Sequence, residues 1–175
     1  AALAPHSASR AYVMGERGSK NEMATPADVM SMAAIVKEGI EHGALGFTTS
    51  RTELHTTGGD QAMPGTYADE AELLGIGRVI GELGGKSIFG LVSDFHNWEQ
   101  EMDWMKRLSI DNNCQVNFVL FFRAEKDWDR VLKQLDYCRR ARAEGALLIP
   151  HVGARPVNIL LSWDGTINPF SFHTH

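Results

Sequence analysis

Polar side chains that could bind or activate a ligand follow several short apolar runs of this sequence. In order along the chain they are Ser50, Arg51 and His55; Ser93, Asp94 and His96; Arg123; and His151 and Arg155. In α/β proteins, ligands gather beyond the carboxyl ends of parallel strands. If the apolar runs are such strands, these groups lie close together at one end of the sheet.

Two histidines have the chemistry of metal ligands. His96 follows Asp94 by two positions directly after an apolar run, so the two side chains could hold a divalent metal or transfer a proton. The alternative is that Asp94 and Asn97 cap the next helix and leave His96 in solvent. His151 could bind a metal or a substrate, or be a loop histidine bonded to the backbone.

Four residues are predicted to bind the substrate: Ser50, Arg51, His6 and Arg155. The guanidinium of Arg51 could form a bidentate pair with a substrate carboxylate. Alternatively, Arg51 pairs with an acid of the protein such as Glu53. His6 is expected in a polar loop that contacts substrate.

Composition limits the class of protein. The chain has 175 residues, of which 43% are hydrophobic and 22% charged, and its formal net charge is -5. These values are typical of a folded domain with no overall attraction for nucleic acid. Without an apolar stretch of about 18 residues or an export signal, we expect a soluble, cytoplasmic protein. The two cysteines are too few for a disulfide framework or a zinc knuckle.

The elements that must position these groups alternate between helix and strand. Apolar residues at three-to-four spacing, with capping residues such as Thr25 and Asn97, predict helices over 26–42, 68–83, 98–111 and 126–144. Short apolar runs predict strands over 44–48, 87–92, 116–122 and 146–149, with a shorter strand over 10–14. This order predicts a parallel α/β architecture, which leaves a barrel and an open sheet as alternatives.

The strand spacing favours part of a barrel. After the first interval the strands recur about every 30 residues, as in an eight-fold β/α barrel. Since four or five units make only part of a barrel, we expect 1–175 to be a single partial barrel domain within a longer protein. Its outer strands would be unpaired edges, through which copies could associate.

Four segments carry a family resemblance. HSASRAYVMGER at 6–17, GALGFTTSR at 43–51, PGTYADEAELL at 64–74 and RPVNILLSWDGTINPF at 155–170 resemble the N-acyl-D-amino-acid deacylase (D-aminoacylase) branch of the amidohydrolase superfamily. The resemblance implies a metal-dependent hydrolase on a distorted β/α barrel. Such an enzyme cleaves the amide of an N-acyl-D-amino acid or a related cyclic amide. Zinc or another divalent metal would polarise the carbonyl and activate water.

The chain also departs from the family pattern. The family's His-x-His pair on the first strand and its catalytic Asp on the last would lie outside this segment. Its Thr-His-x-Arg and Ser-His-His motifs correspond here to VSDFH at 92–96 and LFFR at 120–123. Either His96 or His151 therefore replaces a ligand, or the metal is held differently.

Two functions remain open at this point. One is an amidohydrolase whose isolated segment is inactive and whose catalytic residues are unknown; the other is a non-catalytic barrel relative that binds a small molecule. A serine hydrolase is disfavoured because the sequence has no Gly-x-Ser-x-Gly motif.

Overall fold

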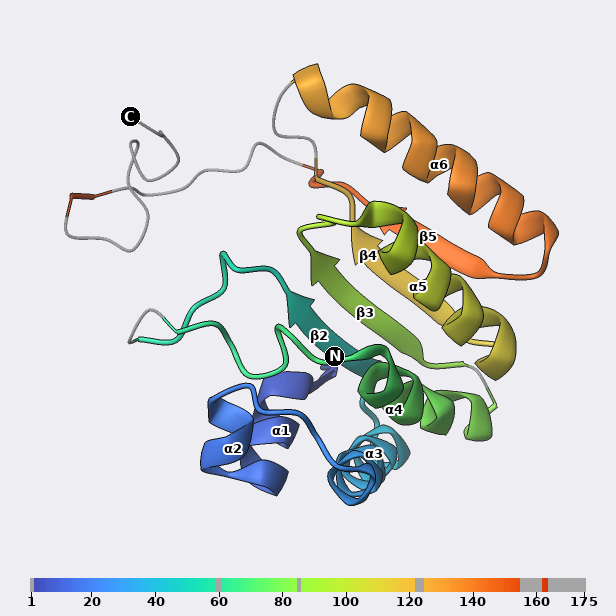
Figure 1. Ribbon diagram of the computed structural model, residues 1–175. Helices are drawn as coiled ribbons and strands as arrows, with labels where there is room; N and C mark the ends of the chain where they lie inside the picture. The colour runs from blue at the N-terminus through green and yellow to red at the C-terminus, as the bar shows by residue number, and fades with distance from the viewer. Residues whose placement is uncertain (1, 59–60, 85, 122–124, 155–161, 164–175) are drawn as a thin grey trace.

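A single parallel sheet organises the chain. The computed structural model describes residues 2–58, 61–84, 86–121, 125–154 and 162–163. Its five strands lie in the order β1-β2-β3-β4-β5, all parallel (Figure 1). The strands are β1 (Ala4–Pro5), β2 (Gly46–Arg51), β3 (Ile88–Ser93), β4 (Gln115–Val119) and β5 (Leu147–His151).

Helices connect successive strands. They are α1 (His6–Met14), α2 (Glu16–Ser19), α3 (Pro26–Glu41), α4 (Glu70–Glu82), α5 (Trp98–Asn112) and α6 (Trp128–Ala143). Each strand pairs with the next one in the chain, and the order never reverses as it does in a doubly wound sheet. The predicted α/β class is confirmed, and the arrangement is that of consecutive β/α units of a barrel.

Capping residues begin the helices largely as expected. The Thr25 side chain accepts a hydrogen bond from the backbone of Asp28, whose carboxylate accepts one in return from the backbone of Thr25. Asn97 caps α5 through the backbone of Gln100. Helix α4, which precedes α5, begins later than predicted because Asp69 is its cap.

Two predictions of secondary structure and packing were wrong. Residues 10–14 belong to helix α1, in which Arg10 and Met14 are buried one turn apart. On α6, the three-to-four spacing of Trp128, Val131, Leu135 and Cys138 predicts one buried face, but Trp128 and Leu135 are 50% and 39% exposed. Val131 is buried as expected, together with Gln134 and Ala141, and Cys138 packs against the core.

An aromatic core joins the sheet to the helices. The rings of Phe47 and Phe89 lie 5.0 Å apart on neighbouring strands, and the ring of Phe89 lies 6.1 Å from that of Trp104 on α5. All three side chains are almost completely buried. This layer stabilises one face of the sheet, and no helix of the described residues covers the other (Figure 1). No helix within the described ranges is long and apolar enough to cross a bilayer.

Gly46 provides a test of the strand pairing. Its φ is +146°, and a Cβ added to it would lie 2.0 Å from the carbonyl oxygen of Ile88 on β3. Because that oxygen belongs to the backbone, Gly46→Ala should lower the free energy of unfolding by about 3 kcal/mol or more. Denaturant unfolding of the chain measures this change. Gly58→Ala is the control, since no atom lies within 4 Å of the added Cβ; equal effects of the two substitutions would contradict the pairing.

Candidate functional site

Alternation along β2 sends neighbouring residues to opposite faces of the sheet. Phe47, Thr49 and Arg51 point towards the helices, where Phe47 joins the aromatic core. Thr48 and Ser50 lie on the other face. Their register partners on β3, Gly90 and Val92, share that face. The helix-free face is therefore built mainly from every second residue of each strand, and Thr49 joins its wall beside His6.

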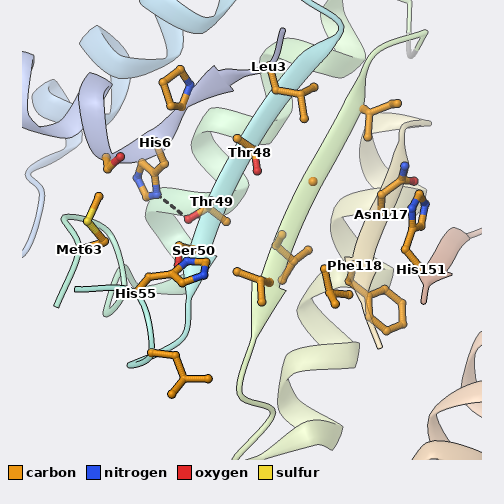
Figure 2. A pocket seen from close by; sticks show the side chains of 18 of the residues that line it. Leu3, His6, Thr48, Thr49, Ser50, His55, Met63, Asn117, Phe118 and His151 are labelled. Carbon is orange, nitrogen blue, oxygen red and sulfur yellow. Dashed lines mark hydrogen bonds between the residues drawn. The ribbon is translucent and has the colours of Figure 1, made fainter. Parts of the chain in front are cut away.

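This face forms a hollow of about 990 Å³, large enough for a small-molecule ligand. Figure 2 shows its floor on β3, with Ser50 and His55 on one side and Asn117 and His151 on the other. Much of the remaining lining is apolar, and among the described lining residues there is no Asp, Glu, Lys or Arg. The hollow thus has an apolar floor and two polar sides, and each side contains a histidine.

Ser50 and His55 form the polar pair nearest the end of β2. The Ser50 Oγ and His55 Nδ1 atoms are 2.8 Å apart. His55 is exposed to the hollow, and Ser50 is half-buried. The structure thus joins Ser50 to His55, which the sequence placed among the polar groups that follow the same strand.

His6 lies in a buried network rather than a polar loop. Its Nε2 is 2.7 Å from Glu72 Oε1 and its Nδ1 is 2.8 Å from Thr49 Oγ1. An ionised carboxylate only accepts hydrogen bonds, so His6 Nε2 carries the hydrogen. Arg10 donates to the other Glu72 oxygen. Although His6 contributes to the wall of the hollow, it is 1% exposed, and its two nitrogens are occupied by the protein.

The Glu72 carboxylate is the centre of this network. Burial alone would raise its pKa, but the hydrogen bond from His6 and the charge of Arg10 outweigh burial and hold the pKa below its ordinary value. The network therefore ties α1 and α4 to β2 through one ionised group.

The loop between β2 and α4 is fastened over His6. The Asn21 amide donates to the carbonyls of Ala62 and Met63 and accepts from the backbone of Gly65. A Cβ at Gly65, whose φ is +97°, would lie 2.6 Å from His6 Nδ1. Only a glycine allows the loop to approach the imidazole this closely.

The Arg51 guanidinium is engaged by the protein and does not line the hollow. It forms a bidentate pair with Glu101, with an Nη2 to Oε1 distance of 2.7 Å, and also donates to the carbonyl of Ala68. It lies 5.8 Å from the ring centre of Trp104. The alternative of an ion pair holds, with Glu101 in place of Glu53.

His96 and His151 line different hollows. The side chain of His96 is 79% exposed and lies 3.9 Å from Asp94 Oδ2 in a hollow beside Arg130. Asp94 accepts hydrogen bonds from Thr52 and from the backbone of Glu53, so it fastens the β2 end instead of capping α5. His151 lies across the sheet, beside Asn117 (Figure 2). Arg155 and Arg123 lie outside the described residues.

The described residues contain no group of three or more His, Cys, Asp or Glu side chains that could hold a metal ion.

Sequence reasoning missed Asn117, whose register with Gly90 places it on the face of the sheet that forms the hollow. The signal was present in β4, where polar Gln115 and Asn117 alternate with buried Val116 and Phe118.

Comparison with known proteins supports the fold. No protein-family model matches the chain, and no curated protein does. Among solved structures, a D-aminoacylase described as defining a novel subset of amidohydrolases superposes with a TM-score of 0.64 at 17% identity. The match covers 84% of this chain and 28% of the D-aminoacylase chain. An N-acyl-D-glutamate deacylase from Bordetella bronchiseptica, complexed with zinc and a phosphonate mimic of the tetrahedral intermediate, gives 0.61 at 20% identity, covering 86% and 30%.

This chain shares its fold with a segment of those amidohydrolases. The resemblance predicted from the sequence is thereby confirmed at the level of the fold. Another matched D-aminoacylase structure, with a TM-score of 0.66 at 17% identity, concerns a binuclear metal centre with one-metal activation and second-metal attenuation. The chain spans less than a third of the length of these deacylases.

Substitution of Glu72 tests the buried network. Glu72→Gln leaves the Arg10 charge buried and uncompensated, so the free energy of unfolding should fall by about 3 kcal/mol or more at neutral pH. Because the folded-state pKa of Glu72 is lowered, its contribution is complete above the ordinary pKa of 4.5 and is lost as the pH falls through the lower folded value. The difference from wild type should therefore shrink in acid.

Denaturant unfolding at a series of pH values measures this effect. Glu70→Gln is a matched control on the same helix, because Glu70 pairs with exposed Arg107 and should contribute at most about 1 kcal/mol. Equal losses for the two substitutions, or a Glu72 effect independent of pH, would contradict the account.

A double-mutant cycle tests the role of Arg51. Arg51→Met and Glu101→Gln should each destabilise the chain, since the partner left behind is mostly buried. The double substitution should lower the free energy of unfolding by less than the sum of the two single losses, with a coupling energy of about 1–3 kcal/mol. Strictly additive losses would mean that the two side chains do not support each other.

Proposed function

We propose that this chain forms part of an amidohydrolase that cleaves the amide bond of an N-acyl-D-amino acid or a related cyclic amide. The observation that carries the proposal is the position of Ser50, His55, Asn117 and His151. They lie at or near the carboxyl ends of the strands, on the helix-free face of a sheet whose fold is shared with two deacylases.

The shape of the hollow suits such a substrate. Its floor contains Gly90 and Val92 of β3, against which an apolar acyl group can pack. The polar side chains on either side can donate or accept hydrogen bonds to the amide and the carboxylate. Of the residues expected on the substrate side, Ser50 keeps that role here, whereas His6 supports the wall and Arg51 supports the helices.

The metal that the fold family implies does not fit the described residues of this chain. Its two candidate ligands, His96 and His151, line separate hollows. In neither hollow do three His, Cys, Asp or Glu side chains of the described residues come close enough together to hold a metal ion. A zinc or other divalent ion in the protein would need ligands beyond the described residues.

The same observation supports a second function, a barrel relative that binds a small molecule without hydrolysing it. The hollow retains its apolar floor and polar sides whether or not a metal is present. We also propose that copies of the chain associate through the outer edges of β1 and β5, since these strands end the described sheet.

Hydrolysis and metal content distinguish the two functions. The protein that contains this chain should release D-amino acids from N-acetyl-D-amino acids, with L-enantiomers cleaved more slowly, and should contain at least one zinc per molecule. Chelation should abolish release. A metal-free protein that binds these compounds and leaves them intact would reject the hydrolase and establish the binding protein.

A further inference from the structure

The charge of the hollow decides how it could recognise an anion. The described lining contains no Lys or Arg that could pair with a carboxylate, and Arg51 is held by Glu101 on the opposite face. It also contains no Asp or Glu, so an anionic ligand meets no repulsion from the walls. The remaining hydrogen-bond donors are hydroxyl, amide and imidazole groups.

The Ser50–His55 pair leaves one imidazole nitrogen for a ligand. His55 Nδ1 is 2.8 Å from Ser50 Oγ, and within the described part of the chain its Nε2 has no hydrogen-bond partner. If Ser50 donates to Nδ1, a neutral imidazole carries its hydrogen on Nε2; if the imidazole is protonated, both nitrogens carry one. A carboxylate at Nε2 would select these two states, because in both it accepts a hydrogen bond.

The backbone holds His55 beside the end of β2. Its N–H donates to the carbonyl of Thr52, and its carbonyl accepts from the backbone of Met63. A further bridge pairs Thr56 with Ala62 across the loop. Since Asn21 fastens the Ala62–Met63 side of this loop, the imidazole is positioned before any ligand arrives.

The opposite side of the hollow lies two to three strands away from Ser50. Asn117 on β4 and His151 on β5 face Ser50 across β3 (Figure 2). The two strand spacings from β2 to β4 amount to roughly 10 Å, and the three from β2 to β5 to roughly 14 Å. One functional group cannot bridge either distance, so the two polar sides suit a ligand that carries two polar groups.

We infer that His55, held by Ser50, is the residue that binds the carboxylate of the ligand, while Asn117 and His151 face its acyl amide. The ligand class rests on the proposed function; the assignment of the carboxylate to His55 rests on the geometry of this hollow. His55 is thus a binding residue that determines specificity for an acid over its neutral amide.

Histidine resonances in NMR spectra of the full chain test this assignment. The probes are N-acetyl-D-alanine and its carboxamide, which differ only in the negatively charged group. The acid should shift the His55 Hε1 resonance in a saturable manner, and the carboxamide should bind at least about tenfold more weakly, as expected when a charge-assisted hydrogen bond is lost.

Variants of the pair and of a distant histidine complete the experiment. His55→Phe identifies the resonance and should remove the preference for the acid, while Ser50→Ala, which keeps the imidazole, should weaken binding of the acid about fivefold. His42→Gln is the control, because His42 bonds to the carbonyl of Glu38 on the exposed end of α3. His42→Gln should change neither the affinity for the acid nor its preference over the carboxamide.

Three results would overturn the inference: equal affinity for the two probes, a shift confined to the His151 resonance, or no saturable binding of the acid. Hydrolysis, measured in parallel on the protein that contains this chain, separates this inference from the proposed function. Binding at His55 without hydrolysis would reject the hydrolase alone, whereas hydrolysis with no preference at His55 would reject the carboxylate assignment alone.

Discussion

The two-residue alternation of side chains along β2 is the constraint on which the site depends. It directs Phe47 and Arg51 towards the helices and Thr48 and Ser50 into the hollow. Thr49 contacts His6 at the wall between them. Adjacent residues at the strand end thus have separate roles: Arg51 binds Glu101 under the helices, and Ser50 holds His55 beside the ligand space. A shift of one residue in register would exchange these roles.

The helix side carries the buried charge that keeps β2 in place. Glu72 reaches from α4 to His6 and Arg10 of α1, and His6 continues the chain of hydrogen bonds to Thr49. Breaking one member leaves a buried polar or charged group without its partner, which costs more than the pair contributes. Because the loop at Gly65 packs on the same imidazole, this network also supports the wall of the hollow.

Sequence reasoning succeeded where the signal is local. Thr25 and Asn97 are capping residues whose effect depends on neighbours three positions away, so α3 and α5 were predicted almost to their ends. It failed where distant residues decide the outcome. The burial of His6 requires Glu72, 66 positions later, and the partner of Arg51 lies 50 positions later on α5. The apolar run 44–48 also gave no indication that its strand continues to Arg51, so the face of each polar residue was unknown.

A crystal structure of the protein with bound N-acetyl-D-alanine tests this division of faces most directly. We predict that the ligand lies on the helix-free face, with its methyl groups against β3 and its carboxylate at His55 Nε2, while Arg51 remains paired with Glu101. A ligand carboxylate bound to the Arg51 guanidinium, with the Glu101 pair broken, would contradict the account. So would a ligand seated in the separate hollow beside His96.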